Sequence, residues 1–434
     1  MEAPPFNAPY IAGQWPIANV RVTNNRIERR WDHSVYRTFA DGDVVQAMPI
    51  YRKTDGTNLL LALTGTDLCR IRTGASETYS YLTDTYTTGH VTGITDDTVT
   101  GSGDGWGASG IGAGDKFILE DDLATPKAEP EGTWAAIETV ADNTIVLEAN
   151  YDTYGGTEGD FSGTPKHYRV RRIYSCPATE RWQWATVNGK FCFTNADVYA
   201  QYWAGSEPEG TAPPAANFAT NLNTTYAYKA KYCIGYANRL LLAHLYDTTT
   251  AAVNPWLLSA SELNDPTGFY GDTGVTSAAN YRFDQTDGPI TGLGVIGNAV
   301  VVYKRTGFHI GQTTNIPSDP LQFPHESRGI GLYAPPSLVH YGGTNAWLGV
   351  DDFYRMNGGE AESIGAPIRR KFFDIVTGDN LENVVGMNSL KYNEIYWVAA
   401  TSGGQEVFVW NYKDNTWTNF TFDSDVSAFG GFGS

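Results

Sequence analysis

Two adjacent carboxylates, Asp351 and Asp352 in the stretch Gly-Val-Asp-Asp-Phe-Tyr, are the first candidates for chemistry. Hydrolysis of a glycosidic bond needs two carboxyl groups that flank the bond, one of which acts as an acid. Neighbouring residues of a strand point to opposite faces of the sheet, so a strand would hold these two groups apart. We therefore interpret the pair as a β-turn between two hairpin strands.

The sequence gives little support for a bound metal ion. The acidic run Glu120, Asp121 and Asp122 resembles a divalent-cation patch, but it lacks the alternate-residue ligands of a calcium loop and is interpreted as a solvated acidic face. The seven histidines are scattered and form no His-Glu-x-x-His pair. The cysteines show no Cys-x-x-Cys spacing, and we expect reduced core thiols in a chain that folds in a cytosol: Cys69, Cys176, Cys192 and Cys233. No metal site is predicted.

Other catalytic and cofactor patterns are missing or incomplete. The glycines Gly110, Gly112 and Gly114 do not stand between a strand and a long helix, as a phosphate-binding loop requires. No Gly-x-Ser-x-Gly elbow is present for a nucleophilic serine. The segment Ser-Gly-Asp-Gly-Trp-Gly (102–107) only approximates the repeated Ser-x-Asp-x-Gly-x-x-Trp turns expected of a six-bladed sialidase. We therefore predict no catalytic residue, no cofactor and no enzymatic activity.

Two short basic runs could contact nucleic acid or an acidic partner. They are Arg369, Arg370 and Lys371, followed by Phe372 and Phe373, and Arg29 and Arg30, followed by Trp31. The first run lies in the best helical candidate of the chain, 361–374, where Pro367 leaves room for only a turn or two. We interpret it as the polar face of one short helix and treat the second run with the same caution.

Acidic charge is concentrated in one part of the chain. Over all 434 residues, 48 Asp and Glu outnumber 30 Lys and Arg, for a net charge of −18. Residues 83–167 hold 16 acidic and 3 basic residues, a net charge of −13, whereas residues 1–82 carry +1 and residues 168–434 carry −6. This balance disfavours tight binding to a phosphate backbone, which needs clustered Lys and Arg. No run approaches the ~20 apolar residues of a membrane span, and no secretory signal is expected at the start.

The elements that would position any site are short β-strands. Runs of Val, Ile, Leu, Tyr, Phe, Trp and Thr alternate with Gly, Asn, Asp and Pro. One hairpin pattern recurs six times, each copy marked by an asparagine: Asn58, Asn188, Asn238, Asn298, Asn345 and Asn393. The spacings are 130, 50, 60, 47 and 48 residues. If roughly 90 residues are inserted in the first interval, all spacings approach the length of a propeller blade.

This repeat predicts an all-β fold, a six-bladed β-propeller with a small β-barrel or sandwich domain inserted in an early blade. A four-stranded sheet with two apolar faces has to be sandwiched, and a ring gives every sheet two neighbours. A set of β-sandwiches is the alternative. The predicted parts are N-terminal strands and the first blade (1–82), an inserted acidic β domain (83–168) and the remaining blades (169–434). The last blade ends near 416–422 and looks one strand short, so we expect an N-terminal strand from 16–31 to complete it.

Longer segments carry a family resemblance. They include Asn-Val-x-Val with Ile-Glu-Arg-Arg (19–30), Ser-Glu-Leu-Asn-Asp-Pro-Thr-Gly-Phe (261–269), Gly-Ile-Gly-Leu-Tyr-Ala-Pro-Pro-Ser-Leu-Val (329–339), Trp-Leu-Gly-Val-Asp-Asp-Phe-Tyr-Arg-Met-Asn-Gly (347–358) and Val-Trp-Asn-Tyr-Lys-Asp-Asn-Thr-Trp (409–417). The chain resembles the propeller-based tail hub, or nozzle, proteins of short-tailed bacteriophages, which include the packaged-DNA stabilisation proteins. The inserted region looks like a small β-module of other phage virion proteins. These motifs are structural, so no site residue is carried over.

The resemblance implies a structural virion protein of the short tail, made in the host cytoplasm. Six copies would form a homohexameric ring below the portal and its adaptor ring, retain the packaged genome and dock fibres or spikes. Double-stranded DNA would pass through the lumen without sequence-specific binding, and like charge would keep the wall from gripping it. Two alternatives stay open. One is a tail-fibre or receptor-contact component, and the other is a carbohydrate-binding or glycan-cleaving propeller with sugar-stacking aromatic rings at Trp203, Trp347 and Trp417.

Overall fold

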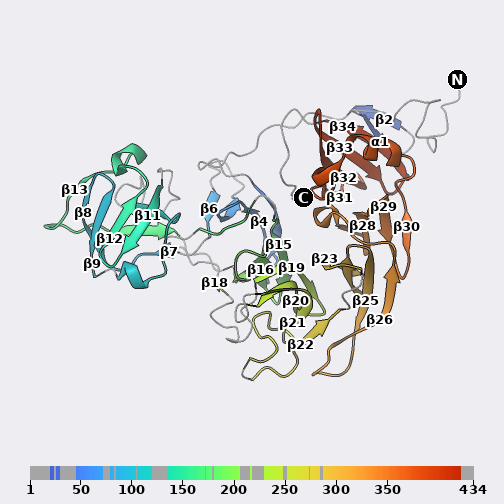
Figure 1. Cartoon of the computed structure of the whole chain (residues 1–434), viewed down its shortest axis with the longest axis horizontal. Coiled ribbons are helices and arrows are strands. Elements are labelled where there is room, and N and C mark those ends of the chain that lie inside the picture. Colours follow the sequence, from blue (N-terminus) through green and yellow to red (C-terminus); the bar gives the residue numbers. More distant parts are fainter. Residues whose placement is uncertain are drawn as a thin grey trace.

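Six four-stranded antiparallel sheets stand in a ring in a computed structural model of the chain, and a further curled sheet stands beside them (Figure 1). The structure describes residues 20–23, 26–29, 45–71, 79–82, 85–103, 105–119, 134–171, 173–177, 180–205, 216–217, 229–247, 252–272, 274–283 and 287–421. This architecture confirms the predicted all-β, six-bladed β-propeller with an inserted β domain, and it excludes the set of β-sandwiches.

Each blade consists of four consecutive strands, so the strand order in every blade is the chain order. Blade 1 contains β3 (Ile50–Arg52), β4 (Asn58–Leu63), β5 (Leu68–Ile71) and β6 (Tyr79–Tyr81). Blade 2 contains β15 (Gln183–Val187), β16 (Lys190–Thr194), β17 (Gln201–Trp203) and β18 (Ala216–Asn217). Blade 3 contains β19 (Lys229–Tyr236), β20 (Arg239–Asp247), β21 (Ala252–Ala260) and β22 (Ala279–Arg282).

The second half of the ring repeats this plan with a few helical turns between the strands. Blade 4 contains β23 (Ile290–Ile296), β24 (Ala299–Lys304), β25 (Gly307–Thr313) and β26 (Leu321–Arg328). Blade 5 contains β27 (Val339–Tyr341), β28 (Thr344–Leu348), β29 (Phe353–Met356) and β30 (Ala361–Ser363). Blade 6 contains β31 (Val385–Ser389), β32 (Glu394–Thr401), β33 (Gly404–Asn411) and β34 (Thr416–Phe420). The helical turns are α1 (Arg369–Ile375) and the 3-10 helices η5 (Pro335–Ser337) and η6 (Gly378–Leu381). Within the described ranges, no helix has the length and hydrophobicity to cross a membrane.

Apolar side chains on both faces of the blades hold the ring together. Five clusters of buried side chains each join two consecutive blades, from blades 1 and 2 round to blades 5 and 6. In the last of these clusters, the ring centroid of Phe353 lies 4.7 Å from that of Trp397 and 5.1 Å from that of Trp417. A blade sheet removed from this ring would expose both apolar faces to water, which is why the strands stack radially.

The prediction that an N-terminal strand completes the last blade is wrong. Blade 6 has four strands of its own, because Val385–Ser389 forms its innermost strand β31. All five residues of β31 are half-buried along the central axis. Its sequence, Val-Gly-Met-Asn-Ser, is short and rich in residues that are uncommon in strands, so it gives only a weak strand signal. Among the described strands, β1 (Val20–Thr23) and β2 (Arg26–Arg29) pair with each other alone, and this hairpin lies beside β34.

The recurring asparagines lie in or just after the turn between the first and second strand of the blades; Asn58 begins β4 and Asn345 is the second residue of β28. Asn188, Asn238 and Asn393 have φ angles of 46°, 57° and 56°, in the left-handed region. In the other blades a glycine of the same turn has the positive φ, as Gly297 does at 54°. Asparagine and glycine are the residues that adopt this conformation at low cost. Asparagine or glycine therefore recurs in each blade because each blade needs a left-handed residue in this turn.

The inserted domain leaves the propeller after β6 and returns before β15, so it lies in the connection between blades 1 and 2 (Figure 1). Its strands are β7 (Thr85–Tyr86), β8 (His90–Thr95), β9 (Thr98–Ser102), β10 (Lys116–Leu119), β11 (Ala135–Ala141), β12 (Thr144–Leu147), β13 (Gly159–Asp160) and β14 (Tyr168–Arg171), with the 3-10 helices η1 (Trp106–Ala108) and η3 (Tyr151–Tyr154). They form one sheet, in the order β13-β8-β9-β12-β11-β10-β14-β7, that curls as a half-barrel.

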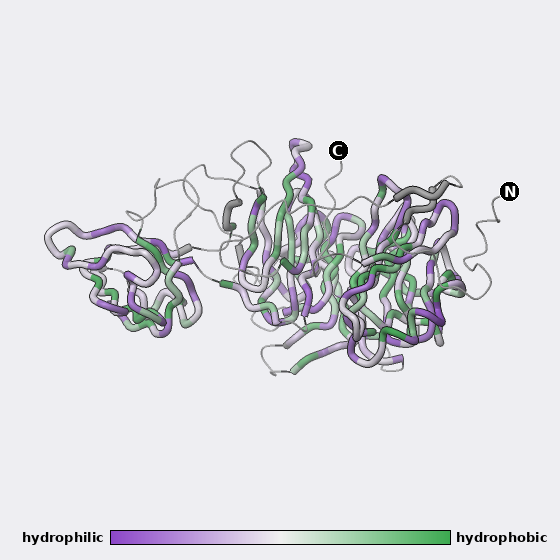
Figure 2. Tube along the Cα trace, turned by 90° about the horizontal axis from the view of Figure 1, so that it is seen from above, coloured by the Kyte–Doolittle hydropathy of each residue, from purple (hydrophilic) through white to green (hydrophobic). Residues whose placement is uncertain are grey.

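The half-barrel encloses a hydrophobic core of its own, separate from the cores of the propeller. At its centre, Trp106 and Tyr168 pack edge to face with ring centroids 5.4 Å apart, and the Trp106 indole N–H donates a 2.6 Å hydrogen bond to the Tyr168 hydroxyl. Figure 2 shows the domain as a second body to one side of the propeller. The strands of this sheet lie between Thr85 and Arg171.

All four cysteines are buried, and none forms a disulfide bond, which agrees with their interpretation as core thiols. Burial raises the pKa of Cys176 and raises those of Cys192 and Cys233 strongly. A raised pKa keeps a thiol protonated at neutral pH, and the protonated form is a poor nucleophile.

We expect N-ethylmaleimide to label none of the four thiols of the native protein within minutes at a pH of about 8, because all four are buried away from the reagent. After unfolding in guanidinium chloride without reductant, all four should react, as counted by mass spectrometry. Fast labelling of the native protein, or fewer adducts after unfolding, would contradict this assignment.

Replacement of Asn238 by alanine should lower the free energy of unfolding by about 1 kcal/mol, because an alanine side chain is strained in the left-handed region. Replacement of the same residue by glycine should change it by a few tenths of a kcal/mol at most. Urea titration monitored by tryptophan fluorescence measures both. Equal effects of the two substitutions would show that the asparagine side chain, not the backbone conformation, is what the turn requires.

Candidate functional site

Asp351 and Asp352 lie in the turn between β28 and β29, as the sequence predicted. Asp352 is 1% exposed, accepts a 2.6 Å hydrogen bond from the Ser363 hydroxyl, and lies 3.2 Å from the guanidinium of Arg369. Asp351 is exposed and accepts a 2.8 Å hydrogen bond from the hydroxyl of Tyr354. The structure therefore separates the two carboxylates and gives each a bonding partner in the blade, rather than aiming both at one space.

The basic run at 369–371 forms the first turn of α1, which confirms its interpretation as the polar face of a short helix. Arg369 and Lys371 each face a carboxylate of blade 5 or blade 6, whereas Arg370 pairs within α1 itself. Arg369, Arg370 and Lys371 pair with Asp352, Asp374 and Glu406 at 3.2, 3.8 and 2.6 Å. Phe372 is buried in the core between blades 5 and 6. The run fastens the helix to the propeller.

Of the remaining candidate residues, the three glycines lie in a loop, and the others lie outside the residues that the structure describes. Gly110, Gly112 and Gly114 belong to the loop between η1 and β10, where the Gly112 N–H donates a 2.9 Å hydrogen bond to the carboxylate of Asp115. Glu120, Asp121, Asp122, Arg30, Trp31 and the side chain of Arg29 lie outside the described residues. Across the described ranges, no three His, Cys, Asp or Glu side chains come together as metal ligands.

The three tryptophans predicted to stack on sugars are buried, so that prediction is wrong for all of them. Trp203, Trp347 and Trp417 each belong to a core between two blades. The indole N–H groups of Trp347 and Trp417 donate hydrogen bonds of 3.0 and 2.9 Å to backbone carbonyls. A strand in a sandwiched blade has no solvent face, and strand alternation alone does not reveal this. Trp184, which sequence analysis did not single out, is 39% exposed at the central axis.

The structure brings together a polar cluster where the inserted domain meets blade 1. Arg171 is the last residue of β14, and its guanidinium lies 3.2 Å from the carboxylate of Asp67 in the turn between β4 and β5. Both side chains are 1% exposed. The guanidinium also lies 4.9 Å from the ring centroid of Trp134, and the Thr66 hydroxyl donates a 2.8 Å hydrogen bond to Asp67. A charge buried this deeply is tolerated only with a partner.

The segment that returns from the inserted domain forms hydrogen bonds both with blade 1 and with the inserted domain. The N–H of Tyr174 donates to the carbonyl of Thr66 at 2.7 Å, and that of Cys176 donates to the carbonyl of Gly65 at 3.0 Å. The N–H of Ile173 donates at 3.0 Å to Asp115 of the inserted domain. We call this set the junction: the turn 64–67, Arg171, and the returning segment 173–176. It links the inserted domain directly to blade 1.

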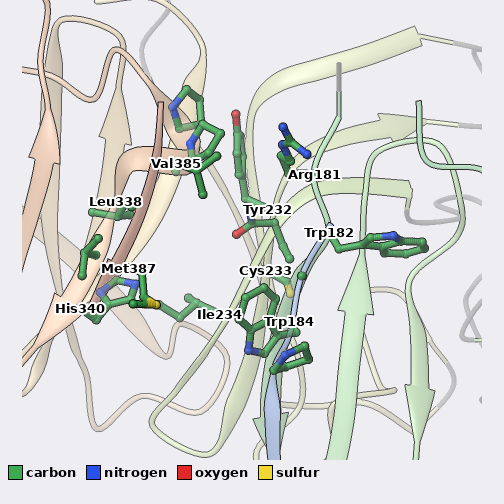
Figure 3. A pocket seen from close by; sticks show the side chains of 18 of the residues that line it. Arg181, Trp182, Trp184, Tyr232, Cys233, Ile234, Leu338, His340, Val385 and Met387 are labelled. Atoms are coloured by element: carbon green, nitrogen blue, oxygen red, sulfur yellow. The ribbon is translucent and has the colours of Figure 1, made fainter. Parts of the chain in front are cut away.

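A cavity of about 460 Å³ lies on the propeller axis. One innermost strand of each blade contributes to its wall: β3, β15, β19, β23, β27 and β31. Figure 3 shows side chains of blades 2 and 3 on one side and of blades 5 and 6 on the other, with Tyr232 and Met387 facing the same space. This volume suits a drug-sized molecule. A DNA duplex does not fit in this volume, because the duplex is wider than its own major groove, which is about 12 Å wide.

No protein-family model and no curated protein matches the chain. Similar solved structures are propeller proteins of several kinds. YCF48 bound to a D1 peptide is 9% identical with a TM-score of 0.34, over 56% of this chain and 69% of that chain. PorZ, from the type-IX secretion system of Porphyromonas gingivalis, is 11% identical with a TM-score of 0.35, over 88% of this chain and 39% of that one. The endosialidase of phage phi92 is 12% identical with a TM-score of 0.26, over 73% and 53%.

The chain thus spans less than two thirds of the PorZ and endosialidase chains. None of the three is a tail nozzle or hub, and at these identities the likeness concerns the fold alone.

Replacement of Arg171 by methionine should loosen the junction, because it leaves the buried Asp67 carboxylate without its counter-charge. Removal of one partner of a buried ion pair costs about 3–5 kcal/mol. Chymotrypsin should therefore cleave at Tyr174 faster than in the parent protein, as followed by mass spectrometry. Arg169→Met, on the same strand but half-exposed, is the matched control and should leave the rate unchanged. Equal rates for both variants would contradict the role of the ion pair.

Proposed function

We propose that the protein is a structural component of a short-tailed phage virion, a tail hub or nozzle protein that assembles as a ring of six copies. The resemblance in sequence suggests this class. The observation that supports it most is the junction, which attaches an acidic β domain to the propeller through a buried ion pair and backbone hydrogen bonds. The two bodies then behave as one building block.

A fixed orientation favours assembly. Association carries an entropy cost for each group that becomes ordered, and a part that is already rigid avoids this cost. The inserted domain has its own core and stands beside the propeller, so it extends the reach of the chain without weakening the ring. Such an arm can contact a neighbouring copy, the adaptor ring or a fibre at a defined angle.

The charge of the arm suits a protein that DNA passes without being held. Carboxylates at the surface of the inserted domain include Asp96, Glu138, Asp142, Glu148, Asp152 and Asp160. They repel phosphates within a Debye length of about 8–10 Å in physiological salt. Because the axial cavity of one chain cannot admit a duplex, the proposed DNA channel lies between the copies of the ring.

Mass photometry of the purified protein, alone and after mixing with the portal and adaptor of the same virion, tests this proposal. We expect a particle with six copies in at least one of the two samples. A monomer in both samples would contradict the hub assignment.

A glycan panel, screened for binding and for release of reducing ends, separates the proposal from its alternatives. We expect neither binding nor cleavage. Binding without cleavage would favour a lectin or receptor-contact role, and cleavage that survives Asp351→Asn and Asp352→Asn would locate an enzyme elsewhere in the chain.

A further inference from the structure

Arg181 lines the axial cavity just before β15. No carboxylate of the described chain lies within 4.0 Å of its guanidinium. The preceding residue, Glu180, is engaged by Lys231 of β19 at 3.0 Å. Burial lowers the pKa of Arg181, the direction expected for a cation that has lost solvent without gaining a counter-charge.

The wall beside this cation is more apolar than polar, although Gln183, His340 and Asn388 also line it. Tyr232 lies close to Arg181 in Figure 3, while Trp184, Ile234 and Met387 lie further along the cavity. The ring of Trp184 is 39% exposed although it faces the inside of a propeller. The cavity therefore has one cationic end and an apolar length, which is the pattern of a site for an amphipathic molecule.

We propose that the axial cavity binds a small amphipathic anion, with its carboxylate or similar acidic group on Arg181 and its aromatic or aliphatic body along Trp184, Ile234 and Met387. An arginine fork and a carboxylate form a paired hydrogen bond that is stronger than a neutral one. The cavity volume of about 460 Å³ lies within the range of small-molecule sites. This site is independent of the proposed assembly role and goes beyond it.

Two fluorescent probes with similar bodies test the proposal. Anilinonaphthalene sulfonate carries an anionic group, whereas N-phenylnaphthylamine lacks it. We expect the intact protein to bind both probes, and Arg181→Gln to raise the Kd of the sulfonate about tenfold, the loss expected for one charge-assisted contact. The Kd of the neutral probe should stay within about twofold, since it makes no such contact.

Control variants separate the site from general surface binding. Arg370→Gln removes an arginine that is 87% exposed and lies outside the cavity, and it should change neither Kd. Arg181→Lys keeps the charge and should restore part of the sulfonate affinity. Trp184→Ala should weaken both probes alike. The proposal fails if the intact protein binds neither probe, or if Arg181→Gln shifts both probes equally or no more than Arg370→Gln does. An unchanged unfolding midpoint shows that each variant is folded.

Discussion

Every blade of this propeller is apolar on both faces, and the rest of the structure depends on that constraint. Five cores shared between consecutive blades satisfy it. Where blade 6 meets blade 1, the buried apolar side chains of the described residues form two separate clusters, one in each blade. The hairpin β1–β2 lies beside β34, and residues 30–44 connect it to blade 1. The two ends of the ring are thus linked by the chain itself and not by a shared sheet.

Features set by neighbouring residues were predictable from the sequence. Hairpin strands, left-handed asparagine turns and the position of the insertion follow from local alternation and turn chemistry. β31 was missed because its sequence, Val-Gly-Met-Asn-Ser, is short and contains glycine, asparagine and serine, which are uncommon in strands. The burial of Trp203, Trp347 and Trp417 was missed because a strand pattern does not say that both sheet faces are covered. The ion pair of Asp67 and Arg171 joins residues far apart in the chain, and no local signal marks either of them.

The junction attaches the most acidic part of the chain to the propeller. An acidic domain on a loose tether would sample many positions, and any contact that it makes would be averaged over them. Here the buried ion pair and the hydrogen bonds of the returning segment 173–176 tie the domain directly to blade 1. Meanwhile the candidates that resembled catalytic or nucleic-acid sites, Asp352 and Arg369, bond to each other and hold α1 on its blade. The polar chemistry of the described chain is thus directed mainly to holding parts in place.

We infer from the contacts of the junction that the inserted domain and the propeller form one rigid block. Pulsed electron paramagnetic resonance measures this directly, with spin labels on Glu148→Cys in the inserted domain and Thr186→Cys in blade 2, both at exposed positions. The buried native thiols should remain unlabelled. A single narrow distance distribution is the result that a rigid block predicts. A broad distribution, of the width expected for a freely jointed domain, would contradict it.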